Sequence, residues 1–332
     1  MLKTELICNL FMKLITKTKL NLNYFSRQKK IVVMIKGGLG NQLFCFAAAK
    51  RLAVMNEAKL IIDNISGFSN DFHYRREFSL HKFNIKDRVA NSTERFEPLG
   101  RLRRRFFRLL NYLIPFKFRR YIRQNSLDFD FRLLDLKFRG SLYLDGMWQS
   151  EEYFKDITGI LLKNLKISAP KDQLNQVMCN NIKRSSNPVC VHVRWFDSPE
   201  KNASNLNLSK DYYLSAIHKI ESLIDNPTYY IFSDNLAATK RLFSNCFKSS
   251  PIYVGHNKST DMAYADLWLM TMCKHFILSN STLNWWGAWL ARKKEIVIYP
   301  EKNFFLIQDN QYKYLFSAFS SFGIKISKKI KE

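Results

Sequence analysis

The sequence contains few cysteines, prolines and glycines, and each scarcity narrows the class of protein. Its 332 residues include six cysteines, eight prolines and eleven glycines. The prolines and glycines are dispersed, which argues against a flexible linker or a low-complexity tract. The cysteines lie far apart and form no CxxC pair, which argues against a zinc site and a disulfide framework. We therefore expect reduced, buried thiols.

A long hydrophobic run is also lacking. The apolar stretch at residues 6–15 is interrupted by Asn9 and Lys13, and no small-residue cleavage site follows it. A segment of this length is too short to span a bilayer and does not have the pattern of a signal peptide. The expected location is the cytoplasm, with peripheral contact at the inner face of the membrane left open.

Acidic residues are scarce relative to basic ones. Lysine and arginine together number 53 against 28 acidic residues, which gives a formal net charge of +25. A field of this sign attracts anions, whether nucleic acid, acidic lipid or a phosphorylated small molecule. Much of the excess is local, because one segment without acidic residues holds Arg101, Arg103, Arg104, Arg105, Arg108, Lys117, Arg119, Arg120 and Arg123.

The sequence does contain a repeated alternation of strand and helix patterns. A β-branched strand at 31–35 precedes a glycine-rich turn, a helix at 42–55 with Asn41 as its N-cap, and a strand at 59–63. Later strands, at 189–193, 229–232, 252–254, 275–278 and 295–299, alternate with helices. This alternation predicts an α/β fold with two Rossmann-like domains facing a cleft. The expected boundaries are a basic extension at 1–30, a first domain at 31–170 with a basic insertion near 101–123, and a second at 171–332.

The glycine-rich turn brings backbone close to a ligand at the start of a helix. It comprises Gly38 and Gly40, followed by Asn41 and Gln42. The third glycine of a dinucleotide fingerprint would fall at Leu43, and no P-loop lysine follows. An NAD-type oxidoreductase, with Asp63 holding the ribose, is therefore a weak alternative. A turn needed only for packing also remains open.

Polar side chains follow three strands of the second half, where open α/β sheets place their ligand-binding residues. They are His192, Arg194 and Asp197 after the first strand, Ser233 and Asp234 after the second, and Asn280, Ser281 and Thr282 after a later one. Arginine suits a diphosphate because its planar fork stays charged and binds two oxygens at once. A salt bridge for Arg194, a core position for His192 and helix capping for the serines are the structural alternatives.

Taken together, these segments resemble the α-1,2-fucosyltransferases of glycosyltransferase family 11. The resemblance rests on four blocks in order. The first is residues 35–52 (IKGGLGNQLFCFAAAKRL), followed by an Arg-x-aromatic-x-Leu-x-x-Phe-Asn-Ile-like stretch at 76–85. The second is residues 146–154 (GMWQSEEYF), the third is His192, Arg194 and Asp197, and the fourth is residues 266–290 (DLWLMTMCKHFILSNSTLNWWGAWL). An ordered set of this kind, which spans about residues 31–300, is much more specific than any single block.

The resemblance implies a GT-B-like fold without a catalytic metal, and transfer of fucose from GDP-β-L-fucose, with inversion, to the 2-hydroxyl of a galactoside. The first domain would bind the acceptor and the second the nucleotide sugar. Arg194 matches the family arginine that stabilises the departing diphosphate. Asp197 is the first candidate for the base because it is a carboxylate in the right loop, with a purely structural role equally open, and His192 completes the predicted catalytic group. The predicted donor-site residues are Gly38, Gly40, Asn41, Gln42, Ser233, Asp234, Asp266, Asn280, Ser281 and Thr282. Trp148, Gln149, Trp195 and Trp285 are predicted at the acceptor or cleft wall, with core packing the alternative for Trp285.

One position departs from the family pattern. The family loop reads His-x-Arg-Arg-Gly-Asp, whereas here Trp195 and Phe196 replace the second arginine and the glycine. Either another cation supplies the missing charge, or Trp195 stacks on the guanine or the acceptor sugar. A related glycosyltransferase with another donor or acceptor, or an inactive relative, stays open.

The basic segment predicts a helix over 101–114, stopped by Pro115. Its leucines and Phe106 share one face and its arginines the other, a pattern typical of helices that rest on anionic lipid. Such a contact would bring the enzyme to lipid-linked oligosaccharide acceptors. A surface helix packed on the domain is the alternative.

A nucleic-acid-binding protein is less favoured, because no known recognition motif accompanies the arginines. The Asp128–Phe129–Asp130 pair is expected to be exposed and not to bind metal.

Overall fold

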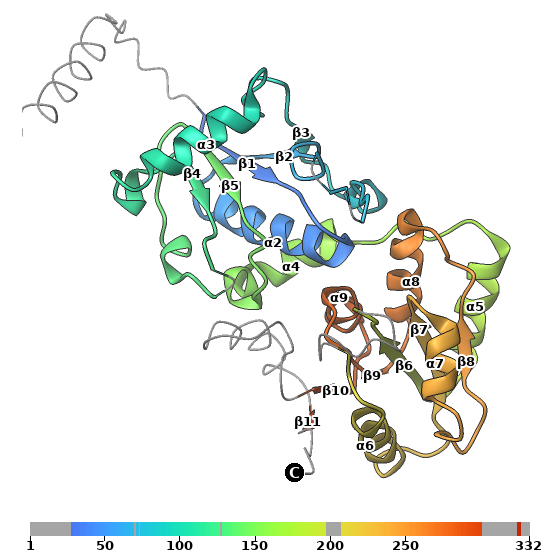
Figure 1. Cartoon of the computed structure of the whole chain (residues 1–332). Coiled ribbons are helices and arrows are strands. Elements are labelled where there is room, and N and C mark those ends of the chain that lie inside the picture. Colours follow the sequence, from blue (N-terminus) through green and yellow to red (C-terminus); the bar gives the residue numbers. More distant parts are fainter. Residues whose placement is uncertain are drawn as a thin grey trace, which may run out of the picture.

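Two α/β lobes make up the part of the chain that the computed structural model describes, residues 28–69, 71–72, 74–126, 128–196, 207–300 and 324–326 (Figure 1). Each lobe is built on its own parallel sheet. The predicted fold of two parallel-sheet units is therefore confirmed. The basic extension at 1–30 lies almost wholly outside the described residues.

The first lobe has five parallel strands in the order β3-β2-β1-β5-β4. Side chains of the central strand alternate between two cores. Ile31 and Val33 belong to the core with helix α2, and Val32 and Met34 to a smaller core against which Phe107 of α3 packs. The sheet therefore carries α2 on one face and α3 on the other. The elements are β1 (Lys30–Met34), α2 (Leu39–Met55), β2 (Lys59–Asp63), β3 (Arg88–Val89), α3 (Gly100–Leu110), β4 (Tyr121–Arg123), β5 (Ser141–Asp145) and α4 (Thr158–Asn164).

The second lobe has six parallel strands in the order β11-β10-β9-β6-β7-β8. Its strand β6 is buried along its whole length, as expected for a central strand covered on both faces. The elements are α5 (Gln173–Arg184), β6 (Pro188–Val193), α6 (Lys210–Glu221), β7 (Thr228–Ser233), α7 (Leu236–Leu242), β8 (Ile252–Val254), α8 (Ala263–Met270), β9 (His275–Ile277), α9 (Thr282–Leu290), β10 (Ile296–Pro300) and β11 (Ile324–Ile326).

Helix α9 of the second lobe packs on α2 of the first. The Trp286 ring lies 5.0 Å from that of Phe44 and stacks at 5.5 Å on Phe154. Its indole N–H donates to the carbonyl of Gly40 at 3.0 Å, and the Trp289 indole donates to Glu151 at 2.7 Å. One cluster of buried side chains consequently runs through both lobes.

Two predicted helix boundaries were wrong. Helix α2 begins at Leu39 and is capped by Gly38, so Asn41 lies in its first turn and its side chain points to other partners. Helix α3 ends at Leu110, short of Ile114. It ends early because the Arg119 guanidinium donates to the carbonyls of Asn111 and Ile114 and holds the chain in a turn.

The cysteine expectation is confirmed for the described chain. Its five cysteines are buried and form no disulfide, and Cys8 lies outside the described residues. Across the described ranges, no helix is both long enough and apolar enough to cross a membrane.

Candidate active site at the junction of the lobes

The carboxyl ends of the parallel strands bring the predicted polar loops to one edge of each sheet. Arg194 follows β6, Asp234 follows β7, and residues 279–282 follow β9. The glycine turn follows β1 in the other lobe. The two edges touch where the Thr282 hydroxyl donates to Asn41 Oδ1 at 2.9 Å. The structure therefore joins the first and fourth sequence blocks in one place.

The glycine turn is required by this contact. Gly37 has φ of +75°, which favours glycine, and a Cβ atom on Gly40 would lie 2.5 Å from backbone and side-chain atoms of Thr282. Gly38 caps α2 without a side-chain hydrogen bond, so the cap residue itself places no side chain over the start of that helix. The first N–H groups of a helix attract anions. The turn thus leaves the N-terminus of α2 available to a negatively charged ligand.

Asn41, Gln42 and Gln149 hold the turn in place. Asn41 Oδ1 accepts from Gln149 Nε2 at 2.7 Å as well as from Thr282. The buried Gln42 amide donates to the carbonyls of Gly37 and Glu77, and its oxygen accepts from the backbone N–H of Ser79. Gln42 and Gln149 therefore shape the site through other protein groups.

Arg194 forms an ion pair with Asp234 at 2.6 Å, as the salt-bridge alternative expected. Both side chains are about one-third exposed, so a ligand can reach them. Asp234 also accepts from the backbone N–H of Trp195 at 3.0 Å. Burial raises the pKa of Asp234 even though the Arg194 guanidinium opposes that shift. The pair leaves little net charge on the second-lobe side of the junction.

Arg76 is a candidate that the sequence analysis quoted in a motif but gave no role. A Cβ atom on Gly38 would lie 3.8 Å from its Nε, and its guanidinium lies 4.0 Å from the centre of the Tyr74 ring. Burial lowers the pKa of Arg76, and the Arg194 guanidinium from the other lobe adds to the effect. Among the described residues its side chain has no ion pair. Its place at the head of the motif at residues 76–85 was the signal that could have pointed to it.

His192 is buried beneath this surface, with Nδ1 2.7 Å from the Ser279 hydroxyl. Burial, and then the charge of Arg194, lower the pKa of His192 to about 3. The imidazole is therefore neutral near pH 7 and a weak base. Its contact with Ser279 fixes the loop after β9 against β6.

The polar loops also cap helices. Ser281 Oγ accepts from the N–H of Leu283 at the start of α9, and Asn235 caps α7 through the N–H of Ala238. The Ser233 hydroxyl accepts from the N–H of Asn235 at 3.1 Å. Asn280 is buried in the same loop. The capping alternative holds for Ser281, and capping leaves Thr282 facing the glycine turn.

Asp266 lies on α8 and accepts from Asn257, in the loop after β8, at 2.8 Å. Burial raises the pKa of Asp266 to about 7, although the Asn257 hydrogen bond opposes the shift. A buried carboxyl with one hydrogen-bond donor has capacity for further donors.

The tryptophans predicted at the acceptor or cleft wall differ in their exposure. Trp148 and Trp285 are 1% and 2% exposed, so they pack in the core and present no wall to an acceptor, which corrects that expectation. Trp195 is half-buried, and its indole N–H donates to Thr239 at 2.9 Å. Asp197 lies outside the described residues.

The described carboxylates and other candidate ligands do not gather around a metal position. Nowhere in the described ranges do three His, Cys, Asp or Glu side chains come close enough to hold a metal ion. In the Asp128–Phe129–Asp130 segment, Asp128 accepts from Ser126, while Asp130 pairs with Arg132 at 2.6 Å.

Two α/β lobes that meet at the carboxyl ends of their parallel strands have the two-lobed, GT-B-like architecture. The chain belongs to glycosyl transferase family 11, whose model matches residues 3–315. The resemblance noted in the sequence is thereby confirmed.

Two curated relatives and one solved structure are similar over most of the chain. The O-antigen biosynthesis glycosyltransferase WbnK of Escherichia coli is 28% identical over 287 residues, 81% of this chain and 93% of WbnK. An α-1,2-colitosyltransferase of Escherichia coli is 26% identical over 274 residues, 78% of this chain and 87% of that protein. The structure of Arabidopsis thaliana FUT1 in complex with GDP, 11% identical, has a TM-score of 0.53 over 83% of this chain and 71% of that one. This last likeness shows the fold.

Proposed function

We propose that the protein transfers L-fucose from GDP-β-L-fucose to the 2-hydroxyl of a galactoside during synthesis of a cell-surface glycan such as O-antigen. The observation that carries the proposal is the junction of the two lobes, where Thr282 donates to Asn41 of the glycine turn, Arg76 lies beside Gly38, and Arg194 follows β6. Membership of family 11 and the similarity to an O-antigen glycosyltransferase support it.

The reaction breaks the bond between the fucose anomeric carbon and the β-phosphate oxygen. The acceptor 2-oxygen bonds to that carbon from the opposite face, which inverts the configuration, and the electron pair of the broken bond leaves with GDP. Negative charge therefore grows on the diphosphate as the transition state forms. Fixed cations placed there stabilise the transition state more than the bound substrate. Arg194, Arg76 and the N-terminus of α2 are assigned to this task.

We assign the guanine to the Asp266 carboxylate and its Asn257 neighbour. Guanine presents adjacent N–H donors on one edge, and a carboxylate accepts two such hydrogen bonds. Ser233, Asp234 and residues 280–282 stand at the same sheet edge and would complete the donor site. The acceptor proton is assigned to Asp197, since a carboxylate in that loop can serve as the base. With arginines neutralising the diphosphate, the proposed reaction needs no metal.

A colitose donor is the second candidate, because one relative is named an α-1,2-colitosyltransferase. Colitose is fucose without its 3-hydroxyl, so both nucleotide sugars present the same diphosphate and guanine.

The oxidoreductase alternative is disfavoured. Asp63 is fully buried and accepts from the Tyr143 hydroxyl at 2.5 Å and from two backbone N–H groups, so it offers nothing to a ribose.

The test is to incubate the purified protein with GDP-fucose or GDP-colitose and a panel of galactosides, with and without EDTA. Product linkage and anomeric configuration are read by NMR. We expect an α-1,2 linkage, formed equally with and without EDTA. Transfer that needs added metal, or a product with retained configuration, would overturn the mechanism. Turnover only with the colitose donor would select the second candidate.

A further inference from the structure

Helix α3 presents Leu102, Phe106 and Leu109 to solvent, while Arg104 and Phe107 face the protein. Arg104 is buried, and its guanidinium donates to the Ser66 hydroxyl at 3.0 Å and the Arg95 carbonyl at 2.9 Å. Amphipathic helices of globular proteins normally bury the opposite, apolar face. The exposed residues are each 59–87% exposed and comprise Leu99, Leu102, Phe106, Leu109, Tyr112, Leu113 and Phe118.

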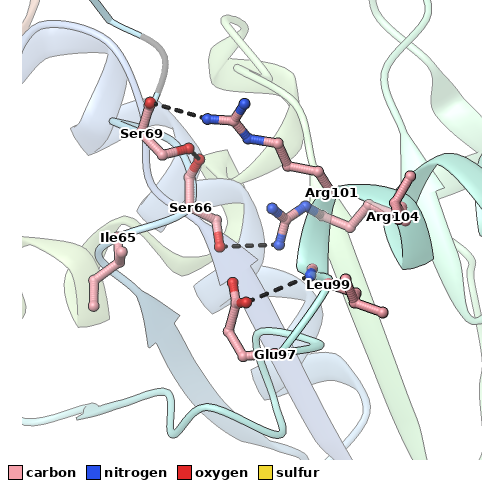
Figure 2. Close-up of a pocket in the computed structure, with 9 residues that line it drawn as sticks. Ile65, Ser66, Ser69, Glu97, Leu99, Arg101 and Arg104 are labelled. Carbon is pink, nitrogen blue, oxygen red and sulfur yellow. Dashed lines mark hydrogen bonds between the residues drawn. The ribbon is translucent and has the colours of Figure 1, made fainter.

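The orientation of α3 is fixed by contacts at both of its ends. Figure 2 shows Arg101 reaching the Ser69 carbonyl, Arg104 reaching Ser66, and the Glu97 carboxylate at the helix start, around a cavity of about 330 Å³. At the other end, Asn111 Nδ2 donates to the Tyr121 carbonyl at 2.7 Å. The helix cannot roll its leucines onto the sheet without breaking these bonds.

Aromatic packing fixes the inner side of the helix as well. The Phe107 ring stacks on that of Tyr121, at 6.3 Å and 12°, and lies 5.3 Å from Phe96. The sheet face under α3 is therefore already filled. The outward apolar face must be covered by something other than this lobe, because contiguous exposed apolar patches mark interaction surfaces.

The charges around this face identify the occupant. Arg101, Arg103, Arg105, Lys117 and Arg120 are exposed next to the apolar residues, and no acidic residue occurs between positions 98 and 127. A second copy of the chain would bring two arginine-rich faces together, and these repel. Nucleic acid would use the arginines but leave the leucines and Phe106 uncovered. An anionic bilayer satisfies both kinds of group.

We propose that α3 and the turn to residue 118 form a docking surface for anionic membrane lipid. Leu102, Phe106 and Leu109 enter the acyl boundary while the flanking arginines contact phosphate headgroups. In Figure 1, α3 lies on the side of the first lobe that faces away from the second lobe, so docking leaves the lobe junction uncovered. The proposal does not rest on sugar transfer, and binding is measured without any donor.

The test is flotation of the purified full chain with phosphatidylcholine vesicles, with or without about 30% phosphatidylglycerol, in about 0.05 M and about 0.5 M salt. The protein is expected to float only with the anionic vesicles, and less at high salt. Replacing Leu102, Phe106 and Leu109 with serine should weaken binding at least about 100-fold. Arg105→Gln with Arg120→Gln should weaken it about 25-fold, about fivefold for each charge.

The matched control is Leu174→Ser with Val177→Ser on α5, which removes two exposed apolar side chains from the other lobe and should leave flotation unchanged. Thermal unfolding should be unchanged in every variant, because these side chains lie outside the core. Failure to float, or equal flotation of the triple serine variant, would overturn the proposal. Light scattering that shows a dimer in the wild type and a monomer in the triple serine variant would also overturn the proposal. RNA binding that the triple serine variant retains, with no vesicle binding, would overturn it as well.

Discussion

The two lobes contribute to their junction in different ways. The first lobe supplies backbone, in the glycine turn and the start of α2, together with Arg76, which has no ion pair among the described residues. The second supplies side chains, above all Arg194, whose charge is balanced by Asp234 at 2.6 Å. The net positive charge at the junction therefore comes mainly from the first lobe.

This difference shows that the residue in the most recognisable motif need not supply the unbalanced charge. Arg194 is held in one position by its ion pair, which favours precise geometry at the transition state. Arg76 has a freer charge, which favours attraction of the diphosphate. The following predictions test whether the two arginines divide the work in this manner.

The largest effect is expected from Arg194→Ala. Loss of a preorganised donor to the developing charge should lower kcat about 10²–10³-fold. The substitution also leaves the Asp234 carboxylate facing the diphosphate. Adding Asp234→Asn should therefore restore about tenfold of the lost rate, roughly the value of one charge contact. Steady-state kinetics of the two single variants and the double variant measure both effects. If adding Asp234→Asn lowers kcat further, Asp234 has a role other than balancing the charge of Arg194.

A smaller loss is expected from Arg76→Ala. Hydrogen bonds to charged groups contribute about 1.5–3 kcal/mol, so kcat/KM should fall about 10–150-fold. The neighbouring Arg75 is exposed and serves as the matched control, with Arg75→Ala expected to keep full activity. Isothermal titration with GDP checks that the loss lies in diphosphate binding. If Arg76→Ala keeps wild-type kinetics, the first lobe contributes only its backbone to diphosphate binding.

The third prediction concerns pH. Burial raises the pKa of Asp266 to about 7, so its carboxylate disappears as the pH falls through 7. If that carboxylate receives guanine, KM for the donor should rise up to about tenfold per pH unit below the pKa. Asp266→Asn should give a high KM that no longer changes over this range. A flat wild-type profile from pH 6 to 8 would remove Asp266 from the donor site.

The titration of Asp266 also changes the stability of the fold, and here the favourable form is the protonated one. Because its pKa is higher in the folded than in the unfolded chain, the folded state holds the proton more tightly, and that stabilisation is lost as the pH rises through 7. Asp266→Asn should therefore increase the free energy of unfolding at pH 8 more than at pH 5. Urea unfolding at the two pH values gives the difference.

The last prediction concerns stability where the two lobes are joined. Trp286→Phe keeps an aromatic ring but removes the N–H that donates to Gly40. The variant should lose about 1–3 kcal/mol of unfolding free energy beyond the loss of packing. Trp148→Phe is the matched control, because the Trp148 indole N–H is buried with no hydrogen-bond partner among the described residues. Equal losses of unfolding free energy in the two variants would contradict this role of the Trp286 hydrogen bond.

The sequence predicted the two sheets and the loops at their edges for a physical reason. β-branched runs such as 31–35 and 189–193 make sense only as buried strands, and parallel strands place their following loops at one edge. Arg194, Asp234 and Thr282 could therefore be located without coordinates. The helix starts were less accurate, since Gly38 caps α2 with backbone alone and residue type favoured Asn41.

Other features could not be predicted because they depend on which surfaces meet. Apolar periodicity is present in both α3 and α9, yet the apolar residues of α9 are buried against α2 while those of α3 remain in solvent. Trp148 and Trp285 were predicted at the acceptor or cleft wall, and only packing shows that they are covered. The hydrogen bond from Thr282 to Asn41 joins residues of different lobes that are 241 positions apart, and such a pairing leaves no local signal.

Helix α9 lies in the second lobe, between β9 and β10, yet it packs on α2 of the first lobe as well as on α8 of its own. Pulling α9 away from α2 would expose several tryptophans, each worth about 1.5–3 kcal/mol or more when buried. A hinge motion that parts the lobes during turnover would have to supply this free energy. Donor entry and GDP escape are therefore expected to proceed with Thr282 held against the glycine turn.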